Sequence, residues 1–214
     1  MCTKIAIVKS IRPLHICNIA NGDKDMEVSS TAPKDWVNYL SNKTSVKPQP
    51  RKVLMYCTKG KIIFKSFGSA KLSVYTIEKM GKSFGHDWGA NGNVVGYFTL
   101  NEVIKIKHHK VKDVQSYEFC GLKYPNSRNS CLSFNELNHY LKGKDGYGWL
   151  IDDLHIFERP RPLKTFNMAC DIKFYPHREP CSKCKCCKHE YQYYECDKSI
   201  KRAPQNYLYC EDDL

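Results

Sequence analysis

The first 29 residues constrain the fold most, because short elements follow one another there with clear stop signals. Lys4 to Ser10 contains an unbroken apolar run, Ile5-Ala6-Ile7-Val8, which predicts a buried strand. Pro13 suits the first turn of a helix, and the apolar residues behind it recur at helical spacing: Ile16, Ile19 and Ala20. The pair Asn21-Gly22 is typical of a helix end. The stretch therefore predicts strand, short helix and second strand in immediate succession.

Three charged side chains flank this predicted helix: Arg12 precedes it, and Lys24 and Glu27 follow it. If the chain is extended there, Lys24 and Glu27 point to opposite faces of the strand unless it bulges. The acidic neighbours of Lys24 favour the charged form of its amine, whereas a catalytic base or Schiff-base lysine needs a lowered pKa. We therefore expect Lys24 to bind a phosphate or carboxylate, or to pair with Glu27.

The run Gly22-x-Lys24-x-x-Glu27 after a short helix resembles the signature of the ASCH domain, a small domain of the PUA-like superfamily. Further segments share the resemblance: Lys52–Thr58, Val94–Phe98, Gly146–Trp149 with Ile151–Ile156, and Arg202–Gln205. Together they resemble the long ASCH-like proteins of phages and prophages of Gram-positive bacteria, over nearly the whole chain except about 35–50. The chain departs from the family pattern at Ser29, where the family has arginine, and at Tyr97, where an acidic residue is frequent.

The resemblance implies an α+β fold: a PUA-like, mostly antiparallel β-barrel with a few short helices. The barrel would span 1–165 and 200–214, with an insertion at about 35–50, and a ligand pocket would lie beside the helix of Pro13 to Asn21. Some ASCH-fold relatives are amidohydrolases that act on an acetylated cytidine with a lysine, a threonine and a glutamate. The lysine matches Lys24, Glu27 stands at the threonine position, and the glutamate has no match. No residue is therefore assigned as catalytic; if the chain is an enzyme, Lys24 and Glu27 are the candidates, in a hydrolase of a modified nucleoside or RNA.

Local patterns predict several further elements. Ser133-Phe134-Asn135-Glu136 is a capping box, and the helix it begins should end near Gly143. Tyr147–Ile151 and Leu154–Phe157 are expected as strands joined by a hairpin or a kink. Pro160-Arg161-Pro162 predicts an edge of the sheet, and Tyr207–Cys210 predicts a last strand beside the others.

Cysteines cluster in 166–199, which the sequence sets apart as a metal-pinned segment. Cys181 and Cys184 have the spacing that presents two thiolates to a tetrahedral zinc ion, and Cys187 repeats it. With Cys196 they form the preferred set of four ligands, which leaves no open position and makes the zinc structural. Four other residues remain possible substitutes: Cys170, His177, Cys186 and His189. Free thiols and disulfides are the alternatives to a metal site.

Charge favours nucleic acid as the partner. The chain has 34 Lys and Arg against 22 Asp and Glu, a formal net charge of +12. Four lysines of one predicted strand and its turn form the densest basic face: Lys105, Lys107, Lys110 and Lys112. Three residues complete the expected ligand contacts with Arg12, Lys24 and Glu27: His86, Trp88 and Tyr97. The sequence thus favours RNA binding through a pocket and a basic face.

Two alternatives stay open beside RNA binding. One is a protein-binding inhibitor of a host defence, similar in role to an anti-CRISPR protein, with the insertion at about 35–50 as its contact. The other is the hydrolase or ribonuclease named above. No apolar run is long enough to span a membrane, and Met1 to Ile5 does not begin a signal peptide, so we expect a cytoplasmic protein, in the host cell if a phage encodes it.

Overall fold

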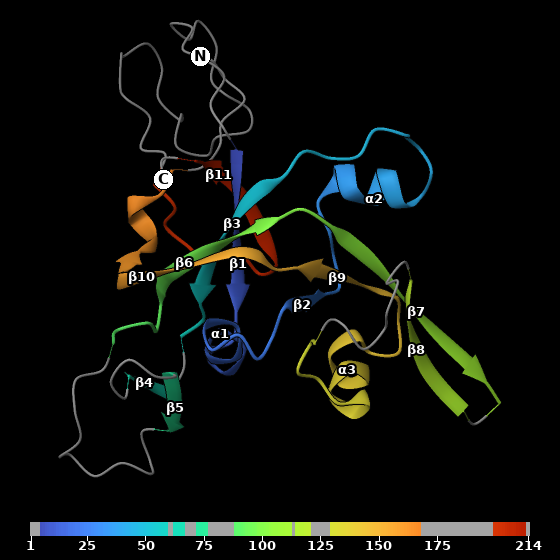
Figure 1. Cartoon of the computed structure of the whole chain (residues 1–214), viewed down its shortest axis with the longest axis horizontal. Coiled ribbons are helices and arrows are strands. Elements are labelled where there is room, and N and C mark those ends of the chain that lie inside the picture. The colour runs from blue at the N-terminus through green and yellow to red at the C-terminus, as the bar shows by residue number, and fades with distance from the viewer. Residues whose placement is uncertain are drawn as a thin grey trace, which may run out of the picture.

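The computed structural model describes residues 5–59, 62–66, 72–76, 88–112, 114–120, 129–167 and 199–212 (Figure 1). Strands predominate in this part of the chain and are joined by three short α-helices and one 3-10 turn. The expected α+β class is therefore confirmed. Within the same residues, no helix has the length and hydrophobicity that crossing a bilayer requires.

The larger sheet has five strands in the order β10-β6-β3-β1-β11. Their bounds are β1 (Ile5–Ile11), β3 (Arg51–Cys57), β6 (Asn93–Leu100), β10 (Asp152–Pro162) and β11 (Tyr207–Glu211). Strands β1 and β3 run parallel, which residues 12–50 make possible by forming a long crossover between them. The other pairings in this sheet are antiparallel, and β11 returns beside β1 as the sequence predicts.

The smaller sheet has four antiparallel strands in the order β2-β9-β7-β8. Their bounds are β2 (Met26–Ser29), β7 (Val103–Val111), β8 (Val114–Cys120) and β9 (Gly146–Leu150). A separate hairpin pairs β4 (Ile62–Ser66) with β5 (Leu72–Thr76). In Figure 1 the β7–β8 hairpin extends away from the body of the molecule, on the side opposite β10.

The main hydrophobic core lies where the two sheets meet. The chain passes from the larger to the smaller sheet after β6, at residues 101–102, and returns through Ile151 between β9 and β10. Ile7 and Phe98 of the larger sheet share one buried cluster with Val103 and Trp149 of the smaller sheet. Burial of this shared apolar surface is the main force that holds the sheets together.

The described strands do not close into the expected barrel. Strands β10 and β11 are the edges of the larger sheet, β2 and β8 are the edges of the smaller one, and no described pairing joins the two. Alternation of apolar and polar residues specifies a strand and its buried face, but closure depends on the tilt and stagger of neighbouring strands. The predominance of antiparallel pairing is confirmed, because β1 with β3 is the one parallel pair among the described strands.

Two of the three helices, α1 and α3, have the terminal signals that the sequence predicts. Helix α1 (Pro13–Ala20) has proline at its first position and Asn21 as its C-cap. Helix α2 (Lys34–Leu40) lies in the predicted insertion and buries Trp36, which joins the main core. Helix α3 (Phe134–Leu141) has the predicted capping box, in which the Ser133 hydroxyl accepts from the Glu136 backbone N–H at 3.4 Å.

The junction of β9 and β10 is a kink rather than a hairpin, because the two strands belong to different sheets. Beyond the kink, β10 pairs irregularly with β6. Ile156 pairs with Gly96 and Arg161 with Val94, so residues 157–160 lie opposite Val95 alone. An insertion of this kind bends a strand away from its neighbour. The prolines at its end lie on a sheet edge, as predicted.

Gly96 is required where β10 approaches β6 most closely. A methyl group on Gly96 would collide with the His155 backbone carbonyl oxygen and would lie 3.0 Å from the Ile156 Cα. Backbone atoms cannot yield as a flexible side chain does, so we expect Gly96→Ala to lower the free energy of unfolding by about 3 kcal/mol in urea denaturation. Gly22→Ala is the control: its site is open, and only its φ of +75° is unfavourable, which should cost about 1 kcal/mol. Equal costs for the two variants would contradict the close approach.

Candidate functional site

The turn after α1 sets the position of Lys24. The Asn18 carbonyl oxygen accepts from the backbone N–H groups of Asp23, at 2.9 Å, and Lys24, at 3.1 Å. Gly22 makes this tight turn possible with a φ of +75°. Lys24 therefore precedes β2, which begins at Met26. The rule that alternate strand residues point to opposite faces does not apply to Lys24.

Lys24 and Glu27 meet in the interior of the protein. The Lys24 Nζ lies 3.1 Å from the Glu27 Oε2, and it donates a hydrogen bond of 2.7 Å to the Ser130 carbonyl oxygen. The two residues are only 2% and 5% exposed. Glu27 Oε2 accepts no hydrogen bond from the described residues, so the contact is an ion pair by distance alone. The ion pair that the sequence allowed for is thus present, and it is buried.

A second amine, that of Lys9 on β1, lies beside this ion pair. Lys9 is 2% exposed; its Nζ donates to the Ser29 hydroxyl at 3.0 Å and lies 4.8 Å from the centre of the Trp149 ring. Burial lowers the pKa of Lys9 and the charge of Lys24 adds to the effect, whereas Glu27 opposes it. Lys9, Lys24 and Glu27, here called the lysine site, thus place two amines around one carboxylate.

Residues of both neighbouring helices surround the lysine site. His15 of α1 has a buried Nδ1 with no hydrogen-bond partner among the described residues, and its pKa is lowered by burial and by Lys24. Tyr140 of α3 has a raised pKa, first through burial and then through Glu27. Arg12 is exposed at the start of α1, and its charge acts on both of these groups. Lys24 and Glu27 are thus in contact with each other, whereas the grouping of Arg12 with them stays a prediction.

Lys9 was not among the residues predicted from the sequence, although a signal was present. In β1, Lys9 alternates with Ile7 and Ile11, which both belong to the main core. A lysine on the buried face of a strand is rare unless it is paired. Its partner is Ser29, the position where the resemblance predicts arginine. In this chain the cation beside that position is the Lys9 amine of β1.

The other expected ligand contacts lie elsewhere. Tyr97 packs on the opposite face of the larger sheet, against a second buried cluster that contains Leu54 and Phe157. The Trp88 indole N–H donates to the Glu158 carbonyl oxygen at 3.1 Å, beside β10. His86 lies outside the described residues. Neither aromatic residue therefore shares a pocket with Lys24 in the described structure.

The predicted basic face of β7 is divided between the two faces of the hairpin and is partly neutralised. Lys105 forms an ion pair with Asp145 at 3.3 Å, and His109 Nε2 lies 2.9 Å from the Glu118 carboxylate. The remaining lysines of the predicted face are exposed and form no ion pair in the described structure: Lys107, Lys110 and Lys112. The pleat places Lys107 and Lys110 on opposite faces of the hairpin.

An aromatic cavity of about 260 Å³ lies between the β7–β8 hairpin and α3. Tyr117 and Phe119 of β8 and Phe134 of α3 contribute its rings, and Met26 and Ser130 also line it. The Tyr117 ring lies 5.0 Å from His108 and 5.8 Å from Phe134, and its hydroxyl donates to Asn138. Because the Ser130 carbonyl also binds Lys24, the cavity adjoins the lysine site.

The predicted zinc ligands Cys181, Cys184, Cys187 and Cys196 lie outside the described residues, so the zinc ion stays a prediction. The possible substitutes lie outside them as well: Cys170, His177, Cys186 and His189. In the part of the chain that the structure describes, no cluster of three or more His, Cys, Asp or Glu side chains is placed to bind a metal.

No family model matches the chain, and no curated protein matches it. Two solved structures are similar to it. One is ASCH from Zymomonas mobilis, with 16% identity and a TM-score of 0.42, covering 74% of this chain and 73% of that chain. The other is a mutant of that protein, with 15% identity and a TM-score of 0.41, covering 74% of this chain and 76% of that chain.

The lysine site predicts an unusual pH dependence of stability. The pKa of Lys9 is lower in the folded chain than its ordinary value of 10.5, so between these two values the unfolded chain binds more protons and stability rises with pH. We expect Lys9→Met to be more stable than the wild type by about 2 kcal/mol near neutral pH, and the gain should shrink as the pH approaches about 10. Urea denaturation at a series of pH values measures this difference.

The matched control is Lys107→Met, which removes an exposed lysine and should change stability by less than about 0.5 kcal/mol. If Lys9→Met lowers stability near neutral pH, or if its effect does not vary with pH, Lys9 is not an uncompensated buried amine.

Proposed function

We propose that this chain is a phage- or prophage-type protein of the ASCH, PUA-like kind that binds single-stranded RNA in the host cytoplasm. A base would enter the aromatic cavity, and the phosphates on either side of it would lie along the β7–β8 hairpin. The observation that carries the proposal is that Tyr117 and Phe119 line the aromatic cavity and also belong to strand β8 of the hairpin. Aromatic faces beside cations are the usual means of holding a single strand.

The register of the hairpin supports this arrangement. Lys110 pairs with Gln115, His108 with Tyr117 and Ile106 with Phe119, so these residues share one face of the hairpin. Tyr117 and Phe119 line the cavity on that face. The Lys110 amine and the His108 ring therefore lie on the same face of the hairpin as the two aromatic rings of the cavity. A phosphate bound by Lys110 would keep its base within reach of the cavity.

The lysine site adjoins the aromatic cavity, and its charge favours an anionic ligand there. Two buried amines face one carboxylate there, so the site is cationic when both amines are protonated. Lys24 contacts the backbone carbonyl of Ser130, which lines the cavity. In a region of low dielectric constant such an excess of positive charge acts over a longer distance than it would in water.

The hydrolase alternative receives less support from this geometry. The Lys24 amine already contacts Glu27 and the Ser130 carbonyl, and it is 2% exposed, so it is poorly placed to act as a base or nucleophile. The inhibitor alternative relied on the insertion at about 35–50 as a protruding contact. Its Trp36 is buried in the main core instead, which leaves less apolar surface there for a partner.

Exposed lysines of the hairpin should set the salt dependence of RNA binding. We expect the triple variant Lys107→Gln, Lys110→Gln, Lys112→Gln to reduce the slope of log affinity against log salt by about 1.4, because each single-stranded phosphate contact contributes about 0.7 and Lys107 lies on the face opposite Lys110. Fluorescence anisotropy with a labelled single-stranded RNA of about 12 nucleotides measures the slope. Lys105→Gln is the control and should change it less, because Asp145 already pairs with Lys105. Binding that is insensitive to salt in the wild type would refute the proposal.

Phe134 tests the cavity separately from the charge. Its side chain is 44% exposed and lines the cavity, so Phe134→Ala removes a stacking face with little loss of core packing. We expect the affinity for the same RNA to fall by about 1–3 kcal/mol with an unchanged salt slope. Val46→Ala, at an apolar residue that is 71% exposed elsewhere, should leave affinity unchanged. If Phe134→Ala binds RNA as tightly as Val46→Ala does, the base does not occupy the cavity.

A further inference from the structure

A second and larger cavity, of about 640 Å³, follows the irregular half of β10. Six side chains give it its chemical character: His155, Phe157, Arg159, Arg161, Thr165 and Phe166. It exists because residues 157–160 lie opposite Val95 alone, so that β10 bends away from β6 and the 3-10 turn η2 (Leu163–Thr165) follows. This β10 cavity belongs to the larger sheet, whereas the hairpin and the aromatic cavity belong to the smaller sheet and α3.

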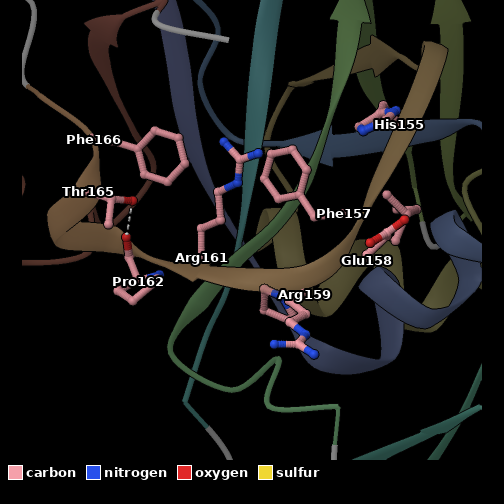
Figure 2. A pocket seen from close by; sticks show the side chains of 10 residues that line it. His155, Phe157, Glu158, Arg159, Arg161, Pro162, Thr165 and Phe166 are labelled. Atoms are coloured by element: carbon pink, nitrogen blue, oxygen red, sulfur yellow. Dashed lines mark hydrogen bonds between the residues drawn. The ribbon is translucent and has the colours of Figure 1, made fainter.

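The Arg161 guanidinium stacks on an aromatic side chain. Its guanidinium carbon lies 4.3 Å from the centre of the Phe157 ring, and Figure 2 shows the guanidinium between the Phe157 and Phe166 side chains. Both rings are nearly buried, with 6% and 5% exposure. A guanidinium stacked in this way loses little additional freedom when it binds an anion, because its plane is already oriented.

A row of rings continues from Arg161 along the sheet. The His155 ring lies 5.8 Å from the Phe157 ring, and it stacks on Tyr97 with 5.0 Å between centroids and 27° between planes. The Lys52 amine lies 5.1 Å from the centre of the Tyr97 ring. His155 is exposed, so it offers a flat surface near Arg161 on which a further ring can stack.

The charge in the β10 cavity favours an anion. Arg159 and Arg161 form no ion pair within the described part of the chain, and Glu158 is the one carboxylate among the residues that line the cavity. The Thr165 hydroxyl donates to the Pro162 carbonyl oxygen at 2.7 Å, so Arg161 is the strongest available donor on this side of the strand. Guanidinium groups pair with phosphate through two parallel hydrogen bonds.

We propose that the β10 cavity binds a phosphorylated nucleoside, with its phosphate on Arg161 and its base on the His155 ring. The volume lies in the usual range for small-molecule sites, roughly 300–1,000 Å³, and exceeds what a phosphate alone would use. A simple anion would leave the row of rings without a contact, and an uncharged aromatic molecule would leave Arg161 without its anion. The ligand is either a free nucleotide or a nucleotide of an RNA strand, since both present the same chemistry.

Calorimetric titration of the full chain with AMP tests the proposal, with adenosine and inorganic phosphate as separate probes. We expect AMP to bind, and each of the two fragments to bind at least about tenfold more weakly. Arg161→Gln should weaken AMP binding about tenfold or more, whereas Arg202→Gln, at an exposed arginine outside the cavity, should have no effect. Arg161→Lys keeps the charge and should lie between these two, which separates phosphate binding from a loss of local structure.

Competition with a 5′-phosphorylated single-stranded RNA distinguishes the two sources. If the RNA displaces AMP and its own binding also weakens in Arg161→Gln, the natural ligand is the RNA strand. If RNA binding is unchanged in that variant, the ligand is a free nucleotide. If AMP does not bind, or binds equally well to Arg161→Gln, the proposal is wrong. The triple hairpin variant should bind AMP normally, so failure of this proposal and failure of RNA binding at the hairpin are separate results.

Discussion

Lys9, Lys24 and Glu27 are buried polar groups that restrict how the two sheets can lie against each other. Lys9 belongs to the larger sheet and donates to Ser29 of the smaller one, so this hydrogen bond joins the two sheets beside the apolar core. Lys24 connects the turn after α1 to β2 through Glu27, and to the segment before α3 through the Ser130 carbonyl. An unpaired buried charge costs free energy. Any shift of one sheet against the other would separate these groups from their partners and lower the stability of the folded state.

The same contact is an inefficient way to stabilise a fold, and this bears on function. Two amines lie near one carboxylate, and burial lowers the pKa of Lys9, because with both amines protonated one of them would lack a full counterion. Apolar residues of similar volume usually stabilise such positions better. Groups that cost folding energy are common at functional sites, where surrounding packing holds them in place. The location of this excess charge beneath an aromatic cavity is consistent with an anionic ligand.

Local sequence signals predicted the elements well, whereas contacts between distant elements were the weak point. The capping box at Ser133 and the apolar run of β1 encode their structures within a few residues, and both predictions are confirmed. The barrel closure could not be predicted in this way, because it depends on strand tilt and register. Neither could the irregular pairing of β10, which appears only when residues 157–160 are set opposite Val95. Lys9 was predictable in principle from its alternation with Ile7 and Ile11, but its partner Ser29 is 20 residues away.

The distribution of charge explains why two surfaces, and not the whole exterior, emerge as candidates for polyanion binding. A formal net charge of +12 acts at long range, but acidic neighbours cancel part of it locally. On the hairpin, Asp145 and Glu118 pair with Lys105 and His109, so the cations without such partners in the described structure lie toward its tip. On β10, Arg161 lies beside a ring instead of an acid. In both places a cation next to an aromatic face, rather than charge alone, distinguishes the surface, because only that combination engages both the phosphate and the base of a nucleotide.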